Sequence, residues 1–201
     1  MAASAAVAAG EGLGAMIQVS APKTCGDRSF NPFDAIAAHM ECLASTMSEE
    51  DGVRIFNDLY LAVTRSVAVE FANGYFEDPA FLSRLGAIFS DRYFDAVERN
   101  VAERSVSRAW APLFQERSET RIAPLGLALA GMNAHINNDL AIALVAAARE
   151  LGYDLDLDSA HYRDHLRVNM MLLRLLHDVK EHLETGIVQT NGRFPGPLAC
   201  L

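Results

Sequence analysis

Five polar residues lie within seven positions of a stretch that is otherwise apolar: Asn133, His135, Asn137, Asn138 and Asp139. At about 100° per residue of α-helix, His135 and Asp139 lie together on one edge of an apolar stripe. Asn133 and Asn137, also four residues apart, lie on its other edge. An unpaired polar group inside a protein costs about 1–3 kcal/mol, so these side chains need partners. Two such pairs beside an apolar stripe could form the walls of a pocket.

A histidine one helical turn from an aspartate favours acid–base chemistry. The carboxylate of Asp139 would hold the His135 imidazole in one tautomer, and the other ring nitrogen could take or give a proton near neutral pH. The reactions within reach are cyclisation, isomerisation, dehydration or hydrolysis of a small, largely apolar metabolite, as in specialised metabolism. The residues predicted to bind that substrate are Asn133, Asn137, Asn169 and Trp110.

A metal site is the second interpretation of the same histidines. His161 and His165 form another pair four residues apart, on the last predicted helix. Together with His135 and Asp139 they would provide a nitrogen and oxygen ligand set that suits a divalent metal such as zinc or iron. The chain has no HExxH motif and no paired ExxH motifs, so the pattern does not specify the metal.

The third interpretation is structural. Buried histidines and asparagines can bond to each other across packed helices and fix the helix register. The chain would then be a non-catalytic helical binding or interaction protein.

The elements that must position these residues are helices. Cap residues followed by proline, Asn31-Pro32 and Asp78-Pro79, predict two helix starts, and a capping-box pattern at Ser48 predicts another. Asp158 is the predicted cap of the last helix. The predicted helices span about 33–47, 48–73, 79–97, a short segment around Trp110, 124–151 and 158–184. We therefore expect an all-α, single-domain bundle of five to seven helices.

The stretch 124–151 is apolar nearly all round, which predicts a long central helix that is buried. The last helix carries a heptad stripe that begins with His161 and His165, typical of a core-facing helix, whereas His177 falls on a charged, solvent-facing side. A short connection predicts that this helix lies antiparallel to the long one, which would bring His161 or His165 toward Asp139.

Length and composition bound the remaining possibilities. The 201 residues suit one domain, with a flexible tail over 1–30, the bundle over 31–186 and a loop-like tail over 187–201. The net charge of −9 with scattered Lys and Arg argues against nucleic acid and against membrane surfaces. Three distant cysteines favour a reducing cytoplasm over a disulfide framework. A small-molecule substrate is the expected partner, and a homo-oligomer stays open.

Four segments of the sequence carry a resemblance to a known family: AGMNAHINNDLAIAL (130–144), DGVRIFNDLYLAVTRSVA (51–68), FEDPAFLSRLGAIFSDRYFDAV (76–97) and AWAPLF (109–114). The chain resembles the bacterial domain-of-unknown-function family 5995 over about 33–183. The family's most specific element, NAHINxDL, is intact from Asn133 to Leu140, and a later element resembles Asp164 with Val168-Asn169. The resemblance implies an all-helical domain and no established reaction. It favours a site on the NAHINxDL residues. The additional histidines His161 and His165 are a departure of this sequence from the family's pattern.

Overall fold

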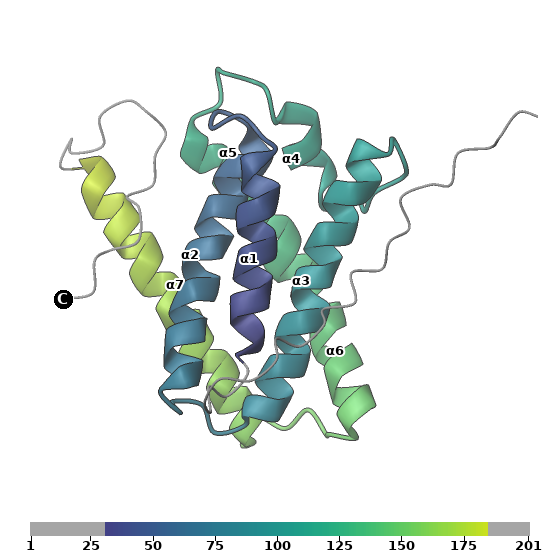
Figure 1. Cartoon of the computed structure of the whole chain (residues 1–201), viewed down its shortest axis with the longest axis vertical. Coiled ribbons are helices and arrows are strands. Elements are labelled where there is room, and N and C mark those ends of the chain that lie inside the picture. The colour runs from purple at the N-terminus through teal and green to yellow at the C-terminus, as the bar shows by residue number, and fades with distance from the viewer. Residues whose placement is uncertain (1–30, 185–201) are drawn as a thin grey trace, which may run out of the picture.

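The computed structural model describes residues 31–184, and within this range the chain is helical without a strand. The helices are α1 (Pro32–Ser45), α2 (Gly52–Ala72), α3 (Pro79–Val101), α4 (Ala111–Glu116), α5 (Pro124–Ala134), η1 (His135–Asp139), α6 (Leu140–Leu151) and α7 (Ala160–Glu184). The segments α5, η1 and α6 follow one another without a break, so we call residues 124–151 the long rod (Figure 1). The predicted all-α bundle is confirmed.

Local signals in the sequence explain most helix boundaries. The side chains of Asn31 and Asp78 accept hydrogen bonds from backbone N–H groups of the first turns of α1 and α3, each with a proline at the helix start. Two predicted caps are wrong, one by three residues and one by a single residue. Asp51, not Ser48, caps α2 by accepting the N–H of Val53 at 2.8 Å. At the start of α7 the Ser159 hydroxyl, rather than Asp158, accepts a backbone N–H.

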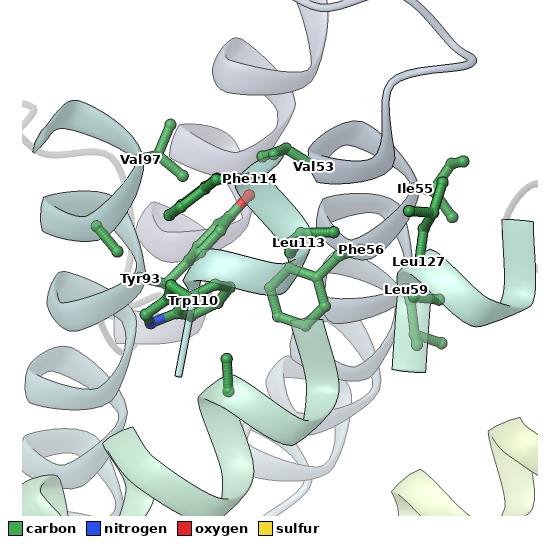
Figure 2. Packing of buried hydrophobic residues seen from close by; sticks show 13 residues of the cluster. Val53, Ile55, Phe56, Leu59, Tyr93, Val97, Trp110, Leu113, Phe114 and Leu127 are labelled. Atoms are coloured by element: carbon green, nitrogen blue, oxygen red, sulfur yellow. The ribbon is translucent and has the colours of Figure 1, made fainter. Parts of the chain in front are cut away.

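The main apolar core lies where α2, α3, α4 and α5 meet. Phe56 packs edge-on against Tyr93 and Trp110, at ring-centroid distances of 5.2 and 5.5 Å. Figure 2 shows Phe56 between these two aromatic rings on one side and Leu127 on the other. Helix α2 packs against α1, α4, α5 and α7, and it is therefore the helix at the centre of the bundle.

The prediction that the long rod is the buried central helix is wrong. Leu129, Ile142 and Val145 lie on an exposed side of the rod, with exposed fractions of 48%, 45% and 40%. Its inner side packs α5 against α2 and α6 against α3. Small residues make up much of that inner side, so the rod packs closely against its neighbours on this side alone.

The last helix was expected to lie antiparallel to the long one, but α7 does not lie alongside α6. It packs against α2 and α3, and in Figure 1 it runs beside α2 while α6 lies beside α3. His177 is exposed, as predicted. The predicted tails over 1–30 and 187–201 lie outside the described residues, as do the side chains at the end of the predicted heptad stripe. None of the described helices combines the length and apolar character needed to cross a membrane.

Candidate functional site

A π-helical turn sits in the middle of the long rod and carries the two residues predicted to do chemistry. It spans His135–Asp139, and the N–H of Leu140 donates to the His135 carbonyl five residues earlier. Nδ1 of His135 lies 3.2 Å from Oδ2 of Asp139. Single π turns within α-helices occur often at functional sites, because they change which side chains share a face. The predicted His135–Asp139 pair is thus in contact, and we call it the dyad.

The carboxylate of Asp139 is enclosed by donors. Oδ2 accepts from Nε1 of Trp110 at 2.9 Å, in addition to its contact with His135. Oδ1 accepts from Nδ2 of Asn138 at 2.7 Å and from Nε of Arg92 at 3.2 Å. A carboxylate offers about four acceptor positions, and here all four are used.

These donors keep Asp139 ionised although it is 2% exposed. Burial alone would raise the pKa of the carboxyl, but the hydrogen bonds from His135 and then Trp110 lower the pKa from its ordinary value. A negative charge behind the imidazole is therefore a fixed feature of the site.

The imidazole of His135 is buried and neutral. Burial lowers the pKa of His135 more than the hydrogen bond to Asp139 raises it. The ring stacks on Phe89, with centroids 3.6 Å apart and planes at 8°, and meets the edge of Tyr60 at 4.6 Å. Because Asp139 accepts at Nδ1, the proton of the neutral ring belongs on Nδ1, and Nε2 is an acceptor. Nε2 is buried and has no hydrogen-bond partner.

His135 borders a cavity of about 110 Å³ between α1, α2, α3, α7 and the long rod. Its walls are formed mainly by apolar side chains. They include Phe33, Val63, Leu85, Ile136, Leu140 and Val168. The polar side chains at the cavity are few, and His135 is the one whose buried ring nitrogen lacks a partner.

The structure does not place Asn133 and Asn137 at the cavity, so the cavity lends no support to their predicted role in binding substrate. Both are exposed, and Nδ2 of Asn137 donates to Oδ1 of Asn133 at 2.8 Å. They face away from the bundle, because the side of the rod that packs inward is the one carrying His135 and Asp139.

Trp110 is 1% exposed and belongs to the main core, not to the residues that line the cavity. The cavity therefore lends no support to its predicted contact with substrate. Its indole N–H holds the Asp139 carboxylate instead, so Trp110 positions the dyad from behind.

Helix α7 brings only part of its predicted set to the cavity. His165 and Asn169 both line it, and Nδ2 of Asn169 lies 3.0 Å from Nε2 of His165. Burial lowers the pKa of His165. Asn169 as a substrate-binding residue stays a prediction.

The four-residue metal set is not assembled. His161 packs against the rings of Phe81 and Tyr153, at 4.6 and 5.5 Å, and is not among the residues that line the cavity. Asp139 has no acceptor position left for a metal. Nowhere in residues 31–177 do three His, Cys, Asp or Glu side chains come close enough to hold an ion. The donors present do not fit the predicted zinc or iron site.

Three residues of the site were given no role in the prediction from the sequence. Asn138 and Arg92 complete the shell around Asp139, and Tyr60 lines the cavity beside His135. Burial raises the pKa of the Tyr60 hydroxyl far above its ordinary value, so that the hydroxyl stays a hydrogen-bond donor. Arg92 and Tyr60 come from helices other than the long rod. The one signal in the sequence that could have found either of them is the apolar face of the second predicted helix, which contains Tyr60.

The fold and the site together define an all-α bundle in which a histidine–carboxylate pair borders a mainly apolar cavity. The model of a family of unknown function (DUF5995) matches residues 33–199, and the chain belongs to this family. Comparison with curated proteins and with solved structures gave no match.

Proposed function

We propose that the protein is an enzyme in which Nε2 of His135 acts as a general base on a small, largely apolar metabolite bound in the cavity. The observation that carries this proposal is the buried, unpartnered Nε2 of His135, a residue that lines a mainly apolar cavity. A buried acceptor without a partner costs about 1–3 kcal/mol. A ligand that donates to this atom would recover that free energy.

The dyad gives each residue a distinct task. Asp139 fixes the tautomer of His135 by accepting its Nδ1–H, which leaves the Nε2 lone pair free to take a proton from substrate. The imidazolium that forms is stabilised by the Asp139 charge, as in other histidine–carboxylate pairs. The same proton then returns from Nε2 to another atom of the substrate. Cyclisation, isomerisation and dehydration can all use this sequence of transfers. In hydrolysis Nε2 would instead take the proton from an attacking water and give it to the leaving group.

The surroundings of the dyad suit a base at neutral pH. Burial lowers the pKa of His135, so the ring is neutral and able to accept a proton. The hydroxyl of Tyr60, from the facing helix α2, is a donor that could bind an oxygen of the substrate. We expect the enzyme to work on a metabolite of the cytoplasm, as the sparse cysteines indicate.

Metabolite profiling tests the proposal. The wild-type protein is incubated with a small-molecule extract of its host cells, and compounds that disappear or form are followed by mass spectrometry. His135→Gln should abolish every conversion that the wild type performs. Asn133→Ala, on the exposed side of the same rod, is the matched control and should convert the same compounds. Conversions that persist in His135→Gln would overturn the proposal.

A second candidate is binding without chemistry. The mainly apolar wall of the cavity favours it, since such a pocket can retain an apolar ligand with few polar contacts. Compounds that bind the wild type in the same extract and are recovered unchanged would favour this candidate over catalysis.

A further inference from the structure

We infer that the ligand of this cavity is a neutral hydroxyl compound of single-ring size, of the phenol class, whose O–H donates to Nε2 of His135. This inference rests on the part of the proposed function that puts Nε2 in contact with the ligand. It adds the size, the charge and the hydrogen-bonding group of that ligand.

The volume of the cavity limits the size of the ligand. An engineered apolar cavity of about 150 Å³ holds one benzene molecule. The cavity beside His135 measures about 110 Å³, which is smaller, so it encloses at most about six non-hydrogen atoms of a ligand. A single six-membered ring is therefore the largest unit that the cavity encloses.

The walls of the cavity set the charge. The described residues that line it include no Asp, Glu, Lys or Arg. Asp139, the carboxylate that contacts His135 at Nδ1, has all its acceptor positions filled. An anion would therefore find no cation and would lie near a negative charge, and a cation would find no free carboxylate oxygen. An unpaired charge inside a protein is costly, so both are excluded.

The orphan nitrogen sets the hydrogen-bonding group. Nε2 of His135 is an acceptor, because the ring proton is on Nδ1 toward Asp139. The ligand must supply a donor and still be neutral at pH 7. Carboxylic acids are ionised at that pH and aliphatic amines are protonated. A hydroxyl stays neutral, donates one hydrogen bond and leaves the rest of the molecule apolar.

Two matched pairs of probes test the class by isothermal titration calorimetry. Phenol and toluene have the same size and differ in the donor. Benzyl alcohol and benzoate differ in charge. We expect phenol to bind roughly tenfold more tightly than toluene, the factor for one net hydrogen bond. Benzyl alcohol should bind more tightly than benzoate by at least the same factor. Equal binding within either pair, or a preference for benzoate, would overturn the inference.

A variant of His135 tests whether the hydroxyl of the probe contacts Nε2. His135→Phe keeps a ring of similar shape and removes Nε2, so toluene should still bind while the preference for phenol falls to about onefold. Retention of the tenfold preference in this variant would show that the hydroxyl binds elsewhere, and would overturn the inference.

A second substitution places the probe in the cavity. Val168→Phe fills space at the cavity wall and should abolish phenol binding, whereas Leu166→Phe, on the exposed side of the same helix, should leave it unchanged. Phenol binding that survives Val168→Phe in a folded protein would contradict the assignment. If Val168→Phe does not fold, the loss of phenol preference in His135→Phe decides alone.

These outcomes separate the ligand class from catalysis. Conversion of metabolites by the wild type without any preference for phenol would overturn the ligand class and leave the general base in place. A phenol preference that depends on His135, with no conversion of any metabolite, would overturn the catalytic proposal and support the ligand class.

Discussion

At the scale of single residues, the site is defined by the different hydrogen bonding of Asp139 and His135. Asp139 receives four donors and stays charged although it is buried. His135 receives one partner at Nδ1 and none at Nε2, and burial keeps it neutral. The result is a neutral imidazole oriented by a fixed charge, with an unpartnered nitrogen on a residue that lines a mainly apolar cavity.

The lowered pKa of His135 predicts an acid-sensitive fold. Below about pH 6.5 the unfolded chain binds a proton at this histidine that the folded protein does not bind. Stability should therefore fall as the pH drops from 7 toward 5, by up to about 1.4 kcal/mol per pH unit for this group. In His135→Gln this contribution is absent, so urea unfolding should show a shallower pH dependence. Equal slopes for the two proteins would contradict the prediction.

The contact of Trp110 with Asp139 predicts a large cost for a small change. Trp110→Phe removes the donor at 2.9 Å and leaves a void in the main core, and should lower the free energy of unfolding by about 2–4 kcal/mol. Urea unfolding measures this loss. In an Asp139→Asn background the same substitution should cost less, because the acceptor has lost its charge. An unchanged cost there would mean that Trp110 acts only by packing.

At the scale of elements, the long rod depends on close approach to α2. The π turn begins four residues after Gly131, where the rod meets the ring of Phe56. The closeness of the two helices at this point keeps the dyad within reach of the rings of Phe56 and Tyr60.

Gly131→Ala tests this approach. An added Cβ would overlap the Phe56 ring and lie 2.8 Å from Phe56 Cβ, so the substitution should destabilise the protein by about 1–3 kcal/mol. Gly126→Ala, on the exposed side of the same helix, should change stability by less than about 1 kcal/mol. Thermal unfolding of the two variants compares them directly. Equal effects would show that the tight contact with α2 does not matter.

At the scale of the whole molecule, the cavity exists because four separate helices and the long rod leave a gap that no side chain fills. Helix α7 closes one side of it with Val168 and Asn169. Asp164 fixes the start of α7 against the turn before α3, by accepting the N–H groups of Glu77 at 3.0 Å and Asp78 at 2.7 Å. This buried carboxylate is the anchor of the closing helix.

Asp164→Ala should therefore destabilise the bundle, by roughly 1–3 kcal/mol for each backbone N–H that loses its partner. Asp158→Ala is the matched control: Asp158 is exposed, and its side chain does not cap α7, so the change should stay within about 0.5 kcal/mol. Chemical denaturation of both variants provides the comparison. A similar loss of stability in Asp158→Ala would show that Asp158 caps α7, as the sequence predicted.

Features encoded over a few neighbouring residues were predictable from the sequence. A helix closes its hydrogen bonds within four or five residues, so Asn31-Pro32 and Asp78-Pro79 suffice to start α1 and α3. The contact of His135 with Asp139 is local for the same reason, since the two residues are one turn apart on one helix.

Only the tertiary structure decided which side of each helix faces the interior. Asn133 and Asn137 have the same spacing as the dyad, yet they lie in solvent because the packing of α5 on α2 turns the other side inward. His161 and His165 share one stripe, but α7 leans on α2 and α3, so that only His165 reaches the cavity. Periodicity defines the sides of a helix, whereas the contacts between distant segments determine which side is buried and where space is left for a ligand.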